Sequence, residues 1–173
     1  MTNKEAKIMS TRSLIWLEVS DGSYRGIYCH HDGYIKRGVG ETLLKYYQDY
    51  DRIVRLINLG GLSSLGMYID PLPDGVHMGY TLSFEEKYYF SSEHSFDNPQ
   101  EDVCVAYHRD RNEELEILSE PNLDGVIKGA EHTWAEYIYI FRTNKWYVID
   151  LSKGYDLKLL EDVWRKIRDN EKN

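Results

Sequence analysis

The chain has 173 residues, of which 42% are hydrophobic and 29% are charged, and its formal net charge is −8. This length fits one domain, and no run of about 18 apolar residues is present that would indicate a transmembrane helix or a membrane partner. Two cysteines are too few for a disulfide framework or a four-cysteine zinc site, so we expect a reduced, cytoplasmic protein without a metal or another cofactor.

The first expected elements are strands. Residues 1–8 are polar and lack the apolar stretch of a secretory signal, so we expect a frayed leader, followed by a single domain over residues 9–173. Residues 13–19 and 24–29 are rich in β-formers and flank Asp21-Gly22. This pattern is typical of a β-hairpin.

A pair of helices is predicted next, because apolar residues recur every three or four positions. The first helix is expected from Glu41 onward, and the second is expected to be capped by Asp51. Gly60 ends the second helix, since glycine enters the left-handed conformation without a steric cost. Residues 62–66 are then expected to form a turn.

Strands return in the second half of the chain. The β-propensity of residues 103–108 predicts a strand, which the charged loop 109–114 follows. Residues 134–141 and 145–149 flank Thr143-Asn144 and predict a second hairpin.

A C-terminal helix is expected to begin at Asp156, with Trp164 on its buried apolar stripe. Strands in two hairpins, a central helix pair and this last helix predict an α+β fold with a mainly antiparallel sheet.

Acidic residues concentrate in the middle third of the chain. From Ser83 to Asp124 there are twelve Asp and Glu but only three Lys and Arg, a net charge of −9. Such a segment repels free duplex DNA and other nucleic acids, whereas a basic groove on a protein partner would attract it. The alternative is a solvated surface that aids solubility. The candidate partner-binding residues are Glu101, Asp102, Glu113, Glu114 and Glu116.

Polar residues at two predicted strand ends are candidates for catalysis. His30 and Asp32 follow the first hairpin, and His108 and Asp110 follow the predicted strand 103–108. Histidine and aspartate serve as metal ligands and as proton carriers, so the four side chains could form a metal or acid–base site if the strand ends meet. The alternative is a structural turn with hydrogen-bonded imidazoles. No complete nucleotide-binding, nucleophile-elbow or zinc-protease motif accompanies them.

Two segments resemble a family of small proteins carried by phages, prophages and other mobile elements. They are residues 9–13, Met-Ser-Thr-Arg-Ser, and residues 28–34, Tyr-Cys-His-His-Asp-Gly-Tyr. The similarity continues through residues 38–44, 59–65, 106–110 and 136–139. The resemblance implies a mobile-element origin, and some similar proteins are anti-CRISPR inhibitors of the type II effector nuclease.

We therefore expect an interaction protein that binds the RNA-guided CRISPR effector nuclease or its guide-RNA complex and blocks guide or target handling in the host bacterial cell. The effector holds nucleic acid in a positively charged channel, which an acidic surface could occupy. The alternative is a nucleic-acid-processing enzyme, a ribonuclease-like hydrolase that cuts guide RNA with His30, Asp32, His108 and Asp110.

Overall fold

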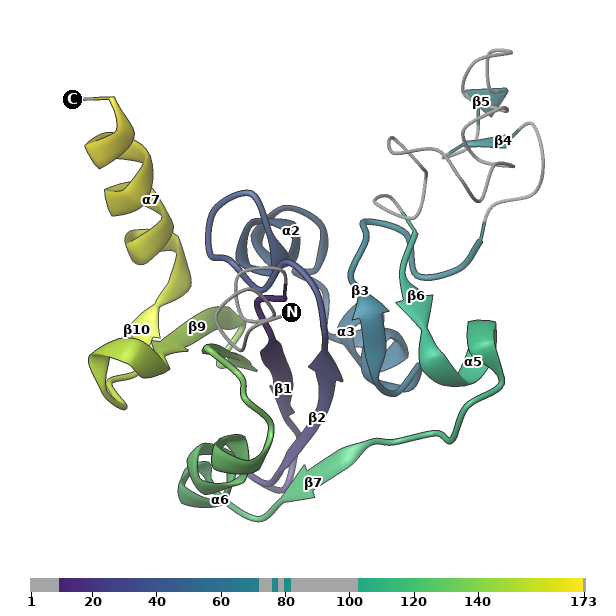
Figure 1. Cartoon of the computed structure of the whole chain (residues 1–173), viewed down its shortest axis with the longest axis horizontal. Helices are drawn as coiled ribbons and strands as arrows, with labels where there is room; N and C mark the ends of the chain where they lie inside the picture. The colour runs from purple at the N-terminus through teal and green to yellow at the C-terminus, as the bar shows by residue number, and fades with distance from the viewer. Residues whose placement is uncertain (1–9, 72–75, 78–79, 82–102, 173) are drawn as a thin grey trace, which may run out of the picture.

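The computed structural model describes residues 10–71, 76–77, 80–81 and 103–172. The strands are β1 (Ser13–Glu18), β2 (Tyr24–Cys29), β3 (Leu62–Ser64), β4 (Val76–His77), β5 (Tyr80–Thr81), β6 (Val105–Ala106), β7 (Leu118–Glu120), β8 (Tyr137–Arg142), β9 (Lys145–Asp150) and β10 (Lys158–Leu159). The helices are α2 (Val39–Tyr46), α3 (Tyr50–Ile57), α5 (Tyr107–Arg111), α6 (Leu123–Gly129) and α7 (Leu160–Glu171), with 3₁₀ turns η2 (Ala130–His132) and η3 (Leu151–Lys153) (Figure 1).

Eight strands form one mixed sheet in the order β10-β9-β8-β1-β2-β3-β6, and β7 pairs with β2 beside this path. The pairs β1–β8 and β2–β3 are parallel, and the other pairs of the sheet are antiparallel. Together with the helix pair α2–α3 and the C-terminal helix α7, this confirms the predicted α+β class. The expected leader, residues 1–8, lies outside the described residues.

Both predicted hairpins are present. Strands β1 and β2 pair from Glu18–Tyr24 to Ser13–Cys29, and Gly22 supplies a positive φ of 85° at the turn. Strands β8 and β9 are joined by Thr143 and Asn144, whose φ angles are 51° and 61°. Two consecutive left-handed residues match the right-handed twist of the strands that they connect.

Each face of the sheet carries its own hydrophobic cluster, because successive side chains of a strand point to opposite faces. On one face, Ile15 and Leu17 of β1 belong to a buried cluster that includes residues of α2, α3 and α7. On the other face, Leu14 and Trp16 pack with Val126 of α6. Strand β1 is therefore buried on both sides and forms the centre of the molecule.

The prediction of a strand over residues 103–108 is mostly wrong. Only Val105–Ala106 pairs as β6, and α5 begins at Tyr107. The carboxylate of Asp110 accepts the backbone N–H of Ala106 at 2.7 Å, and Arg109 donates to the carbonyl of Cys104 at 2.8 Å. These local hydrogen bonds stabilise a helical turn where β-propensity alone favoured an extended chain.

Three other boundaries differ from those expected. Asp49, not Asp51, caps α3, and its carboxylate accepts the N–H of Arg52 at 3.1 Å. Residues 62–64, expected in a turn, form the buried strand β3. The last helix begins at Leu160, because Lys158–Leu159 pairs with β9 before the helix can start.

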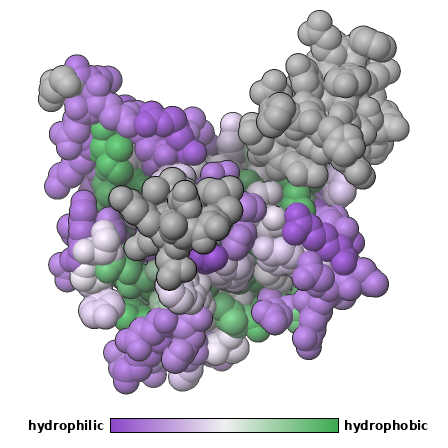
Figure 2. Space-filling view, viewed as in Figure 1, coloured by the Kyte–Doolittle hydropathy of each residue, from purple (hydrophilic) through white to green (hydrophobic). Residues whose placement is uncertain are grey.

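Helix α7 packs less deeply than its apolar stripe predicts. Leu160 is fully buried, but Val163, Trp164 and Ile167 are half-buried. In the space-filling view the outer side of α7 is hydrophilic, and apolar surface lies between this helix and the body of the molecule (Figure 2). Trp164 thus packs against the core from the predicted apolar stripe, but it is only partly buried.

Candidate functional site

Several elements meet where β2 ends. The parallel pairing of β2 with β3 continues beyond the strand, since the backbone N–H of His30 donates to Leu62 O and that of His31 donates to Ser63 O, both at 3.0 Å. Arg12 immediately precedes β1, and Tyr107 immediately follows β6. We call the group formed by Arg12, Tyr28, His30, Ser63, Tyr107 and Arg111 the β2-end cluster.

His30 is held on both ring nitrogens. Its Nδ1 lies 2.8 Å from the hydroxyl of Tyr28, and its Nε2 lies 3.3 Å from the hydroxyl of Ser10. The ring meets that of His31 edge-on, with 4.6 Å between centroids. Partial burial lowers the pKa of His30, and the neighbouring His31, Arg12 and Arg111 lower it further. The imidazole is therefore fixed in place and is biased toward its neutral form.

The two arginines of the cluster contact its aromatic and hydroxyl side chains. The guanidinium of Arg111 lies 5.4 Å from the ring centroid of Tyr107 and 3.4 Å from the hydroxyl of Ser63. Arg12 lies close enough to Tyr28 to lower the pKa of that phenol, although burial raises it overall. Within residues 10–71 and 103–172, no carboxylate forms an ion pair with Arg12 or Arg111.

The other three predicted catalytic residues have different surroundings. Asp32 is exposed in the loop after β2, with a φ of 56°. His108 is exposed on α5, and its Nδ1 lies 2.9 Å from the carbonyl of Glu113. Partial burial favours a raised pKa for Asp110, but hydrogen bonds from Arg109 and from the backbone of Ala106 outweigh it and lower the pKa. Asp110 thus stabilises the start of α5.

The four residues do not form the metal-binding group that the sequence allowed. In the part of the chain that the structure describes, no three His, Cys, Asp or Glu side chains lie together so that they could hold a metal ion. His30 has tyrosine and arginine neighbours instead. Of these, Tyr28 could have been recognised from the sequence, because residues two apart on a strand share a face. Arg12 follows from the register of the β1–β2 hairpin, in which Ser13 faces Cys29. Ser63, Tyr107 and Arg111 required knowledge of the strand order and of α5.

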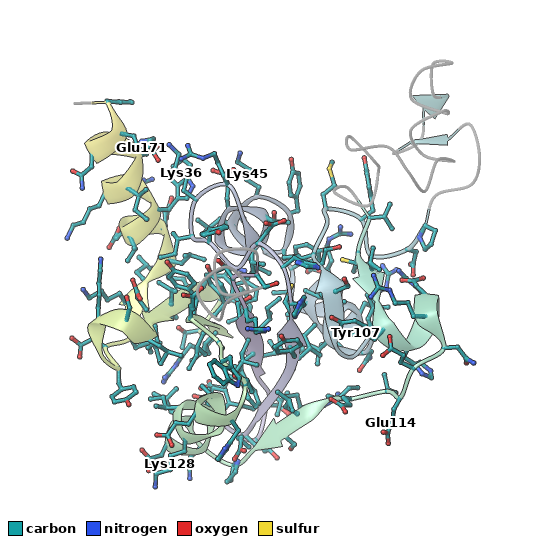
Figure 3. The ribbon with its side chains drawn as sticks, viewed as in Figure 1. Lys36, Lys45, Tyr107, Glu114, Lys128 and Glu171 are labelled. Carbon is teal, nitrogen blue, oxygen red and sulfur yellow. The ribbon has the colours of Figure 1, made fainter. Side chains whose placement is uncertain are left out.

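The predicted partner-binding acids Glu113, Glu114 and Glu116 lie between α5 and β7. With Leu115 they form a segment, residues 113–116, that we call the acidic loop, and Figure 3 shows Glu114 at the edge of the molecule. Its backbone is fixed at both ends: Glu113 N–H donates to Tyr107 O, and Gly61 N–H donates to Glu116 O, each at 3.1 Å.

The side chain of Leu115 lies against Gly60, where an added Cβ would come 2.6 Å from its Cδ1. All four residues of the acidic loop are exposed, and none of its three carboxylates forms an ion pair with a described residue. The loop therefore presents its charges outward from a fixed backbone. Glu101 and Asp102, which were predicted with them, lie outside the described residues.

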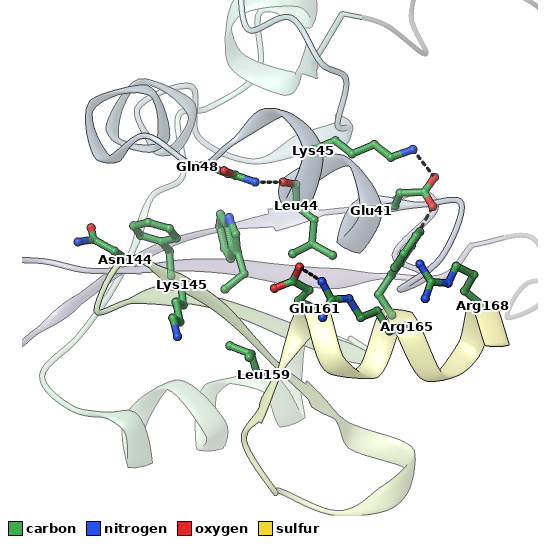
Figure 4. Close-up of a pocket in the computed structure, with 13 residues that line it drawn as sticks. Glu41, Leu44, Lys45, Gln48, Asn144, Lys145, Leu159, Glu161, Arg165 and Arg168 are labelled. Carbon is green, nitrogen blue, oxygen red and sulfur yellow. Dashed lines mark hydrogen bonds and ion pairs between the residues drawn. The ribbon is translucent and has the colours of Figure 1, made fainter. Parts of the chain in front are cut away.

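A groove of about 410 Å³ lies between α2, the β8–β9 hairpin and α7 (Figure 4). Apolar side chains such as Leu44, Trp146 and Trp164 line it. Its two acids are already engaged, because Glu41 accepts the indole N–H of Trp164 at 2.8 Å and Glu161 accepts from Arg165 at 2.8 Å. These contacts connect α7 to the body of the protein and identify no ligand.

No described helix is both long and apolar enough to cross a membrane. No protein-family model matches this chain, and no curated protein and no solved structure shows significant similarity to it. The resemblance to mobile-element proteins therefore remains a prediction from the sequence.

Proposed function

We propose that this chain is an anti-defence protein of a mobile element. It acts in the cytoplasm of the host bacterium, where it binds the type II RNA-guided effector nuclease and blocks the handling of guide or target nucleic acid. The observation that supports the proposal best is the acidic loop, whose Glu113, Glu114 and Glu116 are exposed on an anchored backbone.

An anchored acidic loop suits the basic channel of such an effector for two reasons. Its carboxylates have no ion pair with a described residue, so no salt bridge to this part of the chain must break when a partner arginine or lysine approaches. Its backbone is already held by Tyr107 and Gly61, so little conformational entropy is lost on binding. Effector channels hold nucleic acid through positive charge, and the loop presents the same sign of charge as a phosphate backbone.

Leu115 adds an apolar contact in the middle of the three acids. It is 46% exposed although its side chain also packs against Gly60. A leucine flanked by carboxylates offers a partner both a small apolar surface and a charged rim, which is the usual arrangement of a protein interface. A segment that served solubility alone would need neither the anchoring nor the leucine.

The direct test is co-purification of the tagged protein with a type II effector nuclease from a host of the mobile element, with and without guide RNA. We expect a complex at about 50 mM salt that weakens as salt rises, because exposed charges are screened. The triple variant Glu113→Gln, Glu114→Gln, Glu116→Gln should recover much less effector. Absence of any complex at low salt would refute the proposal.

A matched control removes three exposed charges elsewhere, with Glu131→Gln, Asp156→Asn and Asp162→Asn. This control should recover effector like the parent, which separates the position of the charges from their number. The guide RNA is then examined on a denaturing gel. Shortened RNA would favour the enzymatic alternative, in which His30 provides acid–base chemistry, over simple blocking.

A further inference from the structure

The β2-end cluster contains two arginines, Arg12 and Arg111, near the His30 imidazole. Arg12 and Arg111 both act on His30, and no carboxylate in the described part of the chain lies within ion-pair distance of either guanidinium. Two acids lie close by: Asp110 is hydrogen-bonded to Arg109 and to the start of α5 and also feels the charge of Arg111, and Glu113 acts on Tyr107. The cluster therefore holds two arginines that form no ion pair with a described carboxylate, inside an acidic protein.

We propose that the β2-end cluster binds a phosphate group of a single-stranded nucleic acid, with Arg12 and Arg111 contacting the phosphate and Tyr28 and Tyr107 providing aromatic surface beside it. This site goes beyond the proposed function and does not depend on it, because the isolated protein is the binder. Arginine guanidinium groups recognise phosphate oxygens through paired N–H donors, which lysine cannot reproduce.

The environment of His30 would respond to a bound anion. Its ring is fixed between Tyr28 and Ser10, and the two arginines and His31 oppose its protonation. A bound phosphate would neutralise the arginines and would itself favour the charged imidazole, so its arrival should raise the pKa of His30. A cluster with only a structural role would show no such response to an added anion.

The ligand class follows from the surroundings of the cluster. A rigid duplex places a charge about every 1.7 Å along its axis, so a long footprint would reach the acidic loop that follows α5 and be repelled. A single strand can place one or two phosphates in the cluster and turn its other phosphates away. Tyrosine rings also suit unpaired bases, since stacking on an aromatic side chain stabilises binding of single strands.

The test measures binding of a fluorescent ten-residue oligouridylate to the isolated protein at about 50 mM salt. Uridine monophosphate, inorganic phosphate and a ten-base-pair duplex serve as competitors. Arg111→Gln and Arg12→Gln should each weaken binding about tenfold, as expected for loss of a charge-assisted hydrogen bond. Each should also reduce the slope of log affinity against log salt by about one.

Arg25→Gln is the matched control, because it removes one positive charge from the opposite end of β2, where the arginine contacts Asn58 at 3.4 Å. It should bind the oligonucleotide like the parent. In nuclear magnetic resonance titrations, the pKa of His30 should rise when the oligonucleotide saturates the protein. Arg111 is exposed, so its variant should fold normally even if Arg12→Gln does not.

Equal affinity of Arg111→Gln and Arg25→Gln would overturn the proposal, as would absence of binding at low salt or an unchanged pKa of His30. Competition by uridine monophosphate as strong as that of the oligomer would support the phosphate site and would show that a mononucleotide, not a strand, supplies the phosphate. Competition by the duplex at equal strength would overturn the assignment to single strands.

Discussion

Gly26 lies directly opposite Trp16 in the β1–β2 hairpin, and its replacement by alanine tests the register of the two central strands. A Cβ at this position would lie 2.5 Å from Cε3 of the Trp16 ring and 2.9 Å from the carbonyl oxygen of Ile15. Both distances are far shorter than ordinary van der Waals contact. Trp16 is only 1% exposed and packs against the α6 side of the core, so its ring has little room to move.

The expected cost follows from this overlap. Overpacking of a filled core costs about 1–3 kcal/mol, and the gain from replacing a strand glycine, about 0.5–1 kcal/mol, offsets part of it. We expect Gly26→Ala to lower the free energy of unfolding by about 2 kcal/mol, since the neighbour is a buried indole and a backbone carbonyl. For a domain of this size, that corresponds to a fall in Tm of about 4–8 °C.

Urea melts followed by circular dichroism measure the change, and Gly61→Ala is the matched control. An added Cβ at Gly61 meets only Cδ2 of Tyr107, at 3.5 Å, and Gly61 has no positive φ. The control should therefore stay within about 0.5 kcal/mol of the parent. Equal stability of both variants would refute the pairing of Gly26 with Trp16.

Three further predictions concern α7 and the buried thiols. Trp164→Ala should cost about 2 kcal/mol in urea melts, less than the roughly 3–5 kcal/mol for a fully buried aromatic. Trp164→Phe should cost less, because it keeps an aromatic ring against the core although it loses the hydrogen bond to Glu41. Hydrogen bonds from Arg37 lower the pKa of Glu171 to about 2. The stability that Glu171→Gln removes should therefore be present above about pH 4.5 and vanish as pH falls to about 2. An equal difference in unfolding free energy between parent and variant at both pH values would contradict this ion pair. Burial raises the pKa of Cys29 to about 12, so this thiol should resist alkylation at pH 8 until urea unfolds the protein.

The sequence predicted best those elements whose signals are local. Thr143-Asn144 identifies the β8–β9 hairpin, because both residues adopt the left-handed conformation that a two-residue connection requires. Gly22 identifies the longer connection between β1 and β2, where it supplies a positive φ. Gly60 likewise marks the end of α3, with a φ of 77°. In each case a few adjacent residues decide the structure, so no tertiary contact is needed to recognise it.

Elements that depend on distant partners were not predictable in this way. Strand β7 and helix α6 have no strong periodic pattern, and they form where β2 and the cluster around Trp16 provide a surface. The β2-end cluster is similar: His30 was identified, but its arginine neighbours come from positions 12 and 111. The β1–β2 hairpin brings Arg12 beside His30, but only the parallel pairing of β2 with β3 and the short helix α5 bring Arg111 there.

The rate of association with the effector nuclease tests the central claim most directly. Surface-bound effector is exposed to the parent, to the Glu113→Gln, Glu114→Gln, Glu116→Gln variant and to the Glu131→Gln, Asp156→Asn, Asp162→Asn control over a range of salt concentrations. If the acidic loop meets a basic groove, the first variant should associate more slowly than the parent and with a flatter dependence on salt, and the control should match the parent. Equal association rates for all three proteins at low salt would contradict the account.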